Sequence, residues 1–304
     1  MRSKTAKQIQ VSAVIATLNR IPYLINTLRD CLKQRGVSKE IIVVDQTPRE
    51  NWDEKQLRWV KKKCRYFFQK KKGVSEARNV GIRKARGEII LFLDDDVRVS
   101  SCLFQAHYKS YDNEDIGGVL GLILDNDYKN KKKGIRIWEK RLGIQKKTNT
   151  KTKYITWAPS GNTSYTKKVL KKIKGFDKNL KVYCEDADLS RRVIAGGKKI
   201  RFNSTAVIFH LAAPKGGLEH RNDDEVNKIK WLKLRDIAFY SIKHKKQIGF
   251  TGILFQIWRS GRMYLLNKKM DIIKKENTLK FLKAWIEAIR LSFKKELTTN
   301  HSLD

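Results

Sequence analysis

Short apolar runs alternate with helical patterns over the first 125 residues of the chain. Between the runs, apolar residues recur every three or four positions, as at Leu24 and Leu28 and over 74–84, which predicts amphipathic helices. The runs themselves predict strands at 11–16, 40–44, 66–68 and 89–93. Strands that are apolar without interruption are typical of a parallel sheet with helices on both faces. We therefore predict an α/β fold with a mostly parallel, doubly wound sheet.

The alternation becomes less regular after residue 125. Residues 128–153 are rich in lysine, and we interpret them as a flap inserted into the fold. Beyond them the pattern predicts a lysine-rich helix within 156–173, a helix over 185–195 and a strand over 205–209. The sheet region is therefore expected to extend to residue 210.

Only helical patterns follow residue 210. Two apolar stripes with lysines and arginines between them have these members: Phe250, Ile253, Leu254, Ile257 and Trp258, then Leu279, Leu282, Ile286, Ile289 and Phe293. We predict two regions, 1–210 with the sheet and 211–304 as a basic, all-helical C-terminal extension. Two alternatives fit these helices: they bind an anionic membrane surface, or their stripes pack on the catalytic domain or on a second subunit.

Charge is the most unusual property of the composition. The formal net charge is +36, from 67 basic and 31 acidic residues, which predicts a polyanionic partner such as nucleic acid, a phosphate-bearing substrate or an anionic membrane. An apolar content of 40% excludes global disorder. The four cysteines form no C-x-x-C pair, and no apolar run approaches the roughly 20 residues that span a bilayer. Because the polar N-terminus does not resemble a signal peptide, we expect a cytoplasmic protein, either soluble or peripheral on the inner face of the cell membrane.

Three consecutive carboxylates, Asp94, Asp95 and Asp96, end the predicted strand at 89–93. Adjacent anions repel one another, and their burial is costly unless a cation compensates. Oxygen ligands suit Mg²⁺ and Mn²⁺, which bind carboxylates together with substrate phosphates. For the triplet taken alone, a solvated acidic turn is the alternative.

Polar residues also follow the first two predicted strands. Thr17, Asn19 and Arg20 offer a hydroxyl, an amide and a guanidinium, which suit a base or a diphosphate. Asp45 suits a nucleobase N–H or a ribose hydroxyl, and Arg78 suits a phosphate or the acidic triplet. Structural roles remain alternatives: a helix cap for Thr17, a turn for Asp45 and an exposed helix position for Arg78. Because carboxyl ends of parallel strands share one edge, Thr17, Asp45 and the triplet are expected to converge on one crevice.

Two later segments could also carry chemistry. Glu185 and Asp186 open a predicted helix, where acids favour the positive end of the helix dipole. Asp186 is also a candidate general base toward a hydroxyl nucleophile. His210 ends a predicted strand, and beside clustered carboxylates it becomes a candidate metal ligand.

Eight short motifs follow one another along residues 10–210. They are Val14 to Arg20, Ile41 to Asp45, Ala77 to Ile82, Phe92 to Asp96, Ser160-Gly161-Asn162, Gly175-Phe176-Asp177, Glu185 to Leu189 and Val207 to His210. Their order and spacing resemble a family 2 glycosyltransferase of GT-A fold. The resemblance implies an inverting enzyme that moves a sugar from a nucleotide-diphosphate sugar to a glycan or lipid-linked acceptor. It also implies Mn²⁺ or Mg²⁺ as cofactor and a place in the synthesis of cell-surface polysaccharide, glycolipid or glycoprotein glycans.

The resemblance further implies roles on the donor side. Thr17 and Asp45 would bind the nucleoside, and Asp94 the ribose or the metal-bound diphosphate. Asp96 and Asp94 would coordinate the metal, with His210 as a further ligand. Of the three carboxylates, Asp96 is the one we expect to hold the metal. The rest of the nucleotide-sugar site comprises Asn19, Arg20, Arg78 and Asp95.

On the acceptor side, the resemblance makes Asp186 the base that deprotonates the acceptor hydroxyl, with Glu185 supporting it. Trp157, Gly161 and Asn162 would line the sugar and acceptor pocket. One base without an enzyme nucleophile implies a single displacement with inversion at the anomeric carbon.

Two other functions compete with this interpretation. A basic nucleic-acid-binding protein would explain the charge and the aromatic residues among lysines, but the sequence has no recognisable nucleic-acid motif. The acidic sites would also repel phosphate in the absence of metal, so we expect no nucleic-acid partner. A sugar nucleotidyltransferase shares this kind of sheet, but it needs a glycine-rich phosphate loop after the first strand. This chain has Thr17-Leu18-Asn19-Arg20 there.

Overall fold

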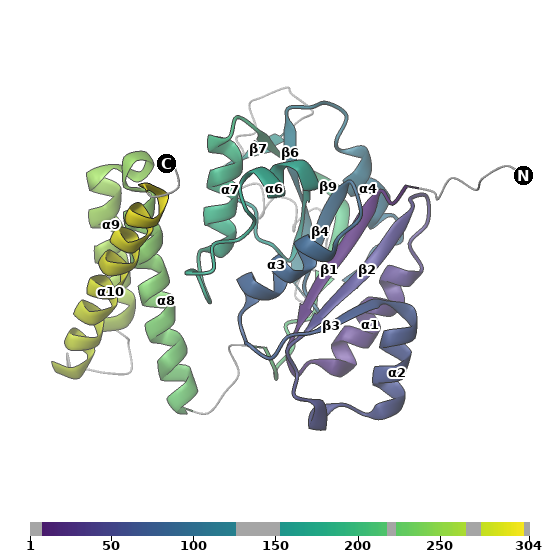
Figure 1. Ribbon diagram of the computed structural model, residues 1–304, viewed down its shortest axis with the longest axis horizontal. Coiled ribbons are helices and arrows are strands. Elements are labelled where there is room, and N and C mark those ends of the chain that lie inside the picture. The colour runs from purple at the N-terminus through teal and green to yellow at the C-terminus, as the bar shows by residue number, and fades with distance from the viewer. Residues whose placement is uncertain (1–7, 126–152, 218–222, 266–274, 301–304) are drawn as a thin grey trace, which may run out of the picture. The chain divides into compact units, whose positions relative to one another are not determined.

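The computed structural model forms two compact units (Figure 1). It describes residues 8–125, 153–217, 223–265 and 275–300. The first unit comprises Met1–Phe176 and Asp186–Gly217, and the second comprises Asp177–Glu185 and Leu218–Asp304. Except for its last residue, the predicted flap at 128–153 lies outside the described residues. The short segment Asp177–Glu185 groups with the helical extension, which the sequence did not predict.

The described part of the first unit contains a mixed sheet, with the order β3-β2-β1-β4-β8-β6-β9-β5 and with β7 paired to β9. Its strands are β1 (Val11–Thr17), β2 (Lys39–Asp45), β3 (Arg65–Phe68), β4 (Ile89–Leu93), β5 (Val97–Val99), β6 (Ile116–Asp125), β7 (Lys153–Ile155), β8 (Asn162–Thr166) and β9 (Lys199–His210). Strands β1 to β4 are parallel, as are β6 and β9, whereas β5, β7 and β8 are antiparallel to their neighbours. The predicted α/β class is confirmed.

Helices pack on both faces of this sheet (Figure 1). They are α1 (Ile21–Leu32), α2 (Glu54–Lys63), α3 (Val74–Lys84), α4 (Leu103–Lys109), α6 (Lys167–Lys172) and α7 (Glu185–Ala195), with a 3₁₀ turn η1 (Arg49–Asn51). Alternation along β1 explains the two layers, because successive side chains of a strand point to opposite faces. Ala13 and Ile15 pack in one core with Leu24 of α1, while Val14 packs in the other with Ala77 of α3.

Several strand ends meet at one edge of the sheet. Thr17 and Asp45 are in register at the ends of β1 and β2, and the acidic triplet follows β4, which pairs with β1. The chain then crosses over in β5, where Val97 lies opposite His210 of β9. This crossover brings His210 beside the triplet, although β4 and β9 are not neighbours in the sheet.

Three long helices, α8 (Asp223–Lys243), α9 (Lys245–Leu265) and α10 (Lys275–Asn300), form most of the second unit. Its buried core contains Leu180, Ala238, Phe239 and Ala288. Backbone dihedrals at Gly249 are not helical, so that α9 has a kink there. Within the described residues, none of the helices combines the length and the hydropathy that a membrane span requires.

A buried carboxylate holds the segment Asp177–Glu185 to α8. Asp236 is 0% exposed, and its Oδ2 accepts hydrogen bonds from three successive backbone N–H groups. The donors, at 2.8–3.0 Å, are Lys181, Val182 and Tyr183. Arg235 pairs with the other oxygen of Asp236 and donates to the carbonyl of Asn179 at 2.8 Å. These contacts fix the backbone just before α7.

Candidate active site

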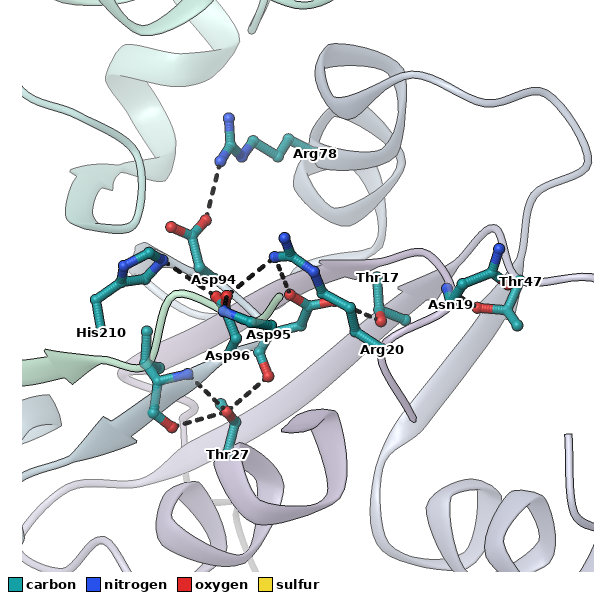
Figure 2. A network of polar contacts seen from close by, with 12 residues as sticks. Thr17, Asn19, Arg20, Thr27, Thr47, Arg78, Asp94, Asp95, Asp96 and His210 are labelled. Atoms are coloured by element: carbon teal, nitrogen blue, oxygen red, sulfur yellow. Dashed lines mark hydrogen bonds and ion pairs between the residues drawn. The ribbon is translucent and has the colours of Figure 1, made fainter. Parts of the chain in front are cut away.

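The three carboxylates after β4 are paired with two arginines (Figure 2). The side chain of Asp94 is 38% exposed, whereas those of Asp95 and Asp96 are 6% and 1% exposed. Arg78 Nη2 lies 3.4 Å from Asp94 Oδ1. Arg20 Nη1 lies 3.3 Å from Asp95 Oδ1 and 3.1 Å from Asp96 Oδ2. Two guanidinium groups thus offset the repulsion that the sequence indicated.

Asp95 is directed into the protein, toward the loop after β1. The Thr17 hydroxyl donates to Asp95 Oδ2 at 2.7 Å. The Thr27 hydroxyl of α1 lies 2.8 Å from the carbonyl oxygens of both Asp95 and Val97. Burial raises the pKa of Asp95 to about 7, although Thr17 and Arg20 act against this shift. Asp95 therefore fixes the Thr17–Arg20 loop to the acidic turn.

Asp94, Asp96 and His210 form a candidate metal site. Each offers one ligand atom, and these atoms lie within 4.8 Å of one another. His210 Nε2 is 3.3 Å from the buried Oδ1 of Asp96. Burial alone would raise the pKa of Asp96, but His210, the Ala213 amide and Arg20 together lower it below its usual value. Two carboxylates and an imidazole with ligand atoms this close to one another fit a divalent cation.

Asp45 is enclosed rather than open to the crevice. It is 0% exposed. Its Oδ2 accepts hydrogen bonds from Trp52 Nε1 and the Tyr66 hydroxyl, each at 2.7 Å, and its Oδ1 accepts one from Thr47 N at 2.8 Å. Thr17 and the triplet therefore come together at this edge, whereas the Asp45 carboxylate offers no accessible oxygen to a nucleoside. Its position shapes the Thr47 turn instead.

The turn at Thr47 also supports the loop after β1. Asn19 has a left-handed backbone conformation, with φ of 56°, and its N–H donates to Thr47 Oγ1 at 2.8 Å. Asn51 Nδ2 donates to Asn19 Oδ1 at 3.1 Å. Asn19 is exposed, so this residue and the partly exposed Arg20 line the open side of the loop.

Asp186 lies in the first turn of α7 and has Trp157 as a neighbour. Burial raises the pKa of Asp186, while a hydrogen bond with the Trp157 side chain and the charge of Arg78 act against it. Arg78 thus acts on Asp94 and on Asp186 alike. The structure brings Trp157 and Arg78 to Asp186, a contact of Arg78 that the sequence did not predict, whereas Glu185 groups with the second unit.

Gly161 and Asn162, expected side by side in the acceptor pocket, have different environments. A Cβ on Gly161 would collide with the Asp94 carboxylate, so the absence of a side chain there makes room for Asp94. Asn162 is 0% exposed, and its Nδ2 donates to the carbonyls of Leu122 and Ala206 at 3.1 and 2.9 Å. Asn162 therefore lies in the sheet interior rather than on the surface of the site.

A buried polar network around Asn162 was not expected from the sequence. His107 of α4 has Nε2 3.0 Å from Asn162 Oδ1 and Nδ1 2.9 Å from Ser164 Oγ, which in turn lies 2.9 Å from the Tyr111 hydroxyl. Burial lowers the pKa of His107 to about 4, so the imidazole is neutral. The network holds β8 to α4 and, through Asn162, to β6 and β9. The only signal for it in the sequence is a histidine within an amphipathic helix.

Comparisons with known proteins agree with this geometry. The chain is 35% identical over 102 residues to an uncharacterized glycosyltransferase of Rickettsia bellii, a match that covers 32% of this chain and 15% of that relative. In fold it is similar to residues 1–349 of TarS of S. aureus in complex with UDP-GlcNAc, with a TM-score of 0.62 and 17% identity over 92% of this chain and 81% of that one. It is also similar to the mannosyltransferase PcManGT of Pyrobaculum calidifontis in complex with GDP-Man and Mn²⁺, with a TM-score of 0.57 and 14% identity over 97% and 80% of the two chains.

The fold of these structures is the GT-A fold that the motifs indicated. The model of the family described as "Glycosyl transferase family 2" matches residues 12–174, which is more than half of the chain. That stretch contains the loop after β1, the acidic triplet and the Ser160-Gly161-Asn162 motif. The chain therefore belongs to glycosyltransferase family 2.

Proposed function

We propose that the protein transfers a sugar from a nucleotide-diphosphate sugar to an acceptor hydroxyl, with inversion at the anomeric carbon. The observation that supports this proposal is the presence of two groups of residues in the site. Asp94, Asp96 and His210 have ligand atoms close enough to hold a cation, and Asp186 has a carboxylate whose pKa burial raises. Arg78 acts on both parts.

The donor side would hold the nucleotide diphosphate. Asp94, Asp96 and His210 would bind Mn²⁺ or Mg²⁺, which supplies charge neutralisation for the diphosphate when bound. Arg20 and Arg78 add fixed positive charge on the same side, and guanidinium groups match the geometry of phosphate oxygens. The PcManGT complex, with its GDP-Man and Mn²⁺, is consistent with such a donor site.

The acceptor side would supply the proton acceptor. The acceptor oxygen attacks the anomeric carbon while its proton passes to a carboxylate oxygen of Asp186. The bond between the anomeric carbon and the diphosphate oxygen breaks, and the nucleotide diphosphate leaves with the electron pair. Attack opposite the leaving group inverts the configuration. Trp157, which bonds to Asp186, would hold the base in place, and Glu185 would support it.

The raised pKa suits this task, because a base is most effective when its pKa is near the working pH. We further propose that the acceptor is a glycan or a lipid-linked glycan of the cell surface. The protein would then act in the cytoplasm, on the inner face of the cell membrane.

Replacement of Asp186 by asparagine tests the role of the base. We expect Asp186→Asn to lose transfer by at least about 100-fold while nucleotide binding stays near wild type. Asp115→Asn is a matched control, because Asp115 is 59% exposed in an ion pair with Lys199 at the opposite end of the sheet. Transfer is measured as the nucleotide diphosphate released from a panel of nucleotide sugars, and nucleotide binding is measured by calorimetric titration. Transfer by Asp186→Asn at the rate of the control would refute the assignment.

Asp96→Ala tests the donor side separately. Nucleotide affinity measured by calorimetry with Mn²⁺ should fall to the value measured without it. The asparagine variant of Asp186 should keep the metal-dependent difference. Equal affinities for wild type and Asp96→Ala under both conditions would refute the metal role and leave the test of Asp186 unaffected.

A further inference from the structure

Helix α10 has apolar side chains both in the core of its unit and on its exposed surface. Ala284 and Ala288 are buried, the latter in the core of the second unit, and both are 0% exposed. The exposed apolar members, at 42–51% exposure, are Leu279, Leu282, Ile286 and Ile289. Their spacing of three and four residues makes one continuous stripe. Trp285 and Leu291 pack against the core of the unit, so the exposed stripe is a second apolar face of the same helix.

A second exposed stripe follows the kink in α9. Its members, at 47–75% exposure, are Phe250, Leu254, Phe255 and Trp258. Aromatic and aliphatic side chains grouped in this way differ from single apolar residues on a surface, which need no explanation. Both stripes therefore indicate contact with an apolar phase.

Basic residues accompany both stripes. Lys245 and Lys246 are exposed at the start of α9, and Lys283 and Arg290 are exposed on α10. Lys283 and Arg290 are seven residues apart and so lie on the same side of their stripe. The described acid nearest to them on α10, Glu287, lies 3.6 Å from Arg235.

We propose that the exposed faces of α9 and α10 dock this protein on an anionic lipid bilayer, with the apolar stripes among the acyl chains and the basic residues at the lipid headgroups. Charge complementarity favours this occupant over a second copy of the chain. Residues 237–304 contain 14 Lys and Arg against 5 Asp and Glu, so that two copies would bring like charges together. An anionic bilayer instead attracts each basic residue and accepts the apolar side chains. The proposal goes beyond sugar transfer, and it can fail without affecting Asp186 or Asp96.

The test uses the full chain and sedimentation with vesicles of phosphatidylcholine alone or of phosphatidylcholine with phosphatidylglycerol. We expect binding to the anionic vesicles to be at least about tenfold tighter. Two variants remove the apolar side chains, Phe250→Ser/Trp258→Ser in α9 and Leu282→Ser/Ile286→Ser in α10. Loss of binding by at least about tenfold in one or both supports the proposal and identifies the helix. Tyr154→Ser, which removes an aromatic side chain of 46% exposure in the first unit, is the matched control and should bind as wild type does.

A third variant, Lys283→Gln/Arg290→Gln, changes only exposed positions. It tests the proposal even if circular dichroism shows that a serine variant does not fold. It should weaken binding to anionic vesicles and leave binding to neutral ones unchanged. Wild-type protein that does not bind anionic vesicles overturns the proposal, as do serine variants that bind like wild type. Light scattering measures the oligomeric state. If the wild-type protein is a dimer that the serine variants convert to a monomer, with vesicle binding unchanged, the proposal is wrong and the stripes form the contact with a second copy.

Discussion

Replacing Asp236 by asparagine should loosen the segment that leads into Asp186. The carboxylate of Asp236 binds the N–H groups of three successive residues and pairs with Arg235, which is only 4% exposed. Asparagine keeps the size of the side chain but removes its charge. It also offers one carbonyl oxygen in place of two carboxylate oxygens, so either the backbone N–H groups or Arg235 lose their acceptor.

The magnitude follows from the number of partners. A hydrogen bond to a charged group contributes about 1.5–3 kcal/mol, so the three N–H groups together would contribute several times that if all were lost. Asparagine retains part of this interaction, and removal of one member of a buried ion pair costs about 3–5 kcal/mol. We therefore expect Asp236→Asn to lower the free energy of opening of the segment by about 3–5 kcal/mol.

Hydrogen-exchange mass spectrometry of the peptide that contains 181–183 measures this free energy directly. Glu287→Gln is the matched control, because it removes the same charge near the same Arg235. Glu287 is 40% exposed at 3.6 Å, and an exposed pair contributes at most about 1 kcal/mol. Equal protection of the peptide in both variants would refute the reasoning, since the loss would then reflect net charge rather than the buried contacts.

Three further predictions concern the first unit. Gly121→Ala should lower the free energy of unfolding, measured in urea, by about 1–3 kcal/mol, because a Cβ there would collide with the Asn162 amide. A change of less than about 0.5 kcal/mol would contradict this contact. Transfer should increase with pH through a pKa above the ordinary carboxylate range, because burial raises the pKa of Asp186 and only its deprotonated form accepts the proton. A rate that falls over that range of pH would contradict the role of a base. Thr17→Val should cost about 1–3 kcal/mol of stability by removing the donor to the buried Asp95, and thermal unfolding at wild-type stability would contradict it.

The sequence predicted those helices and strands that have an unbroken apolar run or a regular helical pattern. The bounds of β4, α3 and α7 agree with the apolar run at 89–93 and the helical patterns at 74–84 and 185–195. The position of the acidic triplet at the end of a strand was predictable for the same reason. The metal roles of Asp96 and His210 stay predictions, although the structure places the two side chains together.

Long-range contacts determine what the sequence did not predict. Strand β8 has the sequence Asn-Thr-Ser-Tyr-Thr, which lacks an apolar run, yet its first four residues are buried. Its polar groups are satisfied by partners such as His107, 55 residues from Asn162 along the chain. The enclosure of Asp45 depends likewise on Trp52 and Tyr66, from a turn and a neighbouring strand. A single sequence does not show which of these residues meet.

The charges around the triplet suggest the order in which ligands bind. When all three carboxylates are ionised, they and the guanidinium groups of Arg20 and Arg78 leave a single formal negative charge, which would repel a diphosphate. A divalent cation at Asp94, Asp96 and His210 would reverse the sign of this local charge and attract the diphosphate instead. Metal binding should therefore precede tight nucleotide binding. Since linkage between two ligands is reciprocal, the nucleotide should raise the affinity for Mn²⁺ by the same factor as Mn²⁺ raises the affinity for the nucleotide.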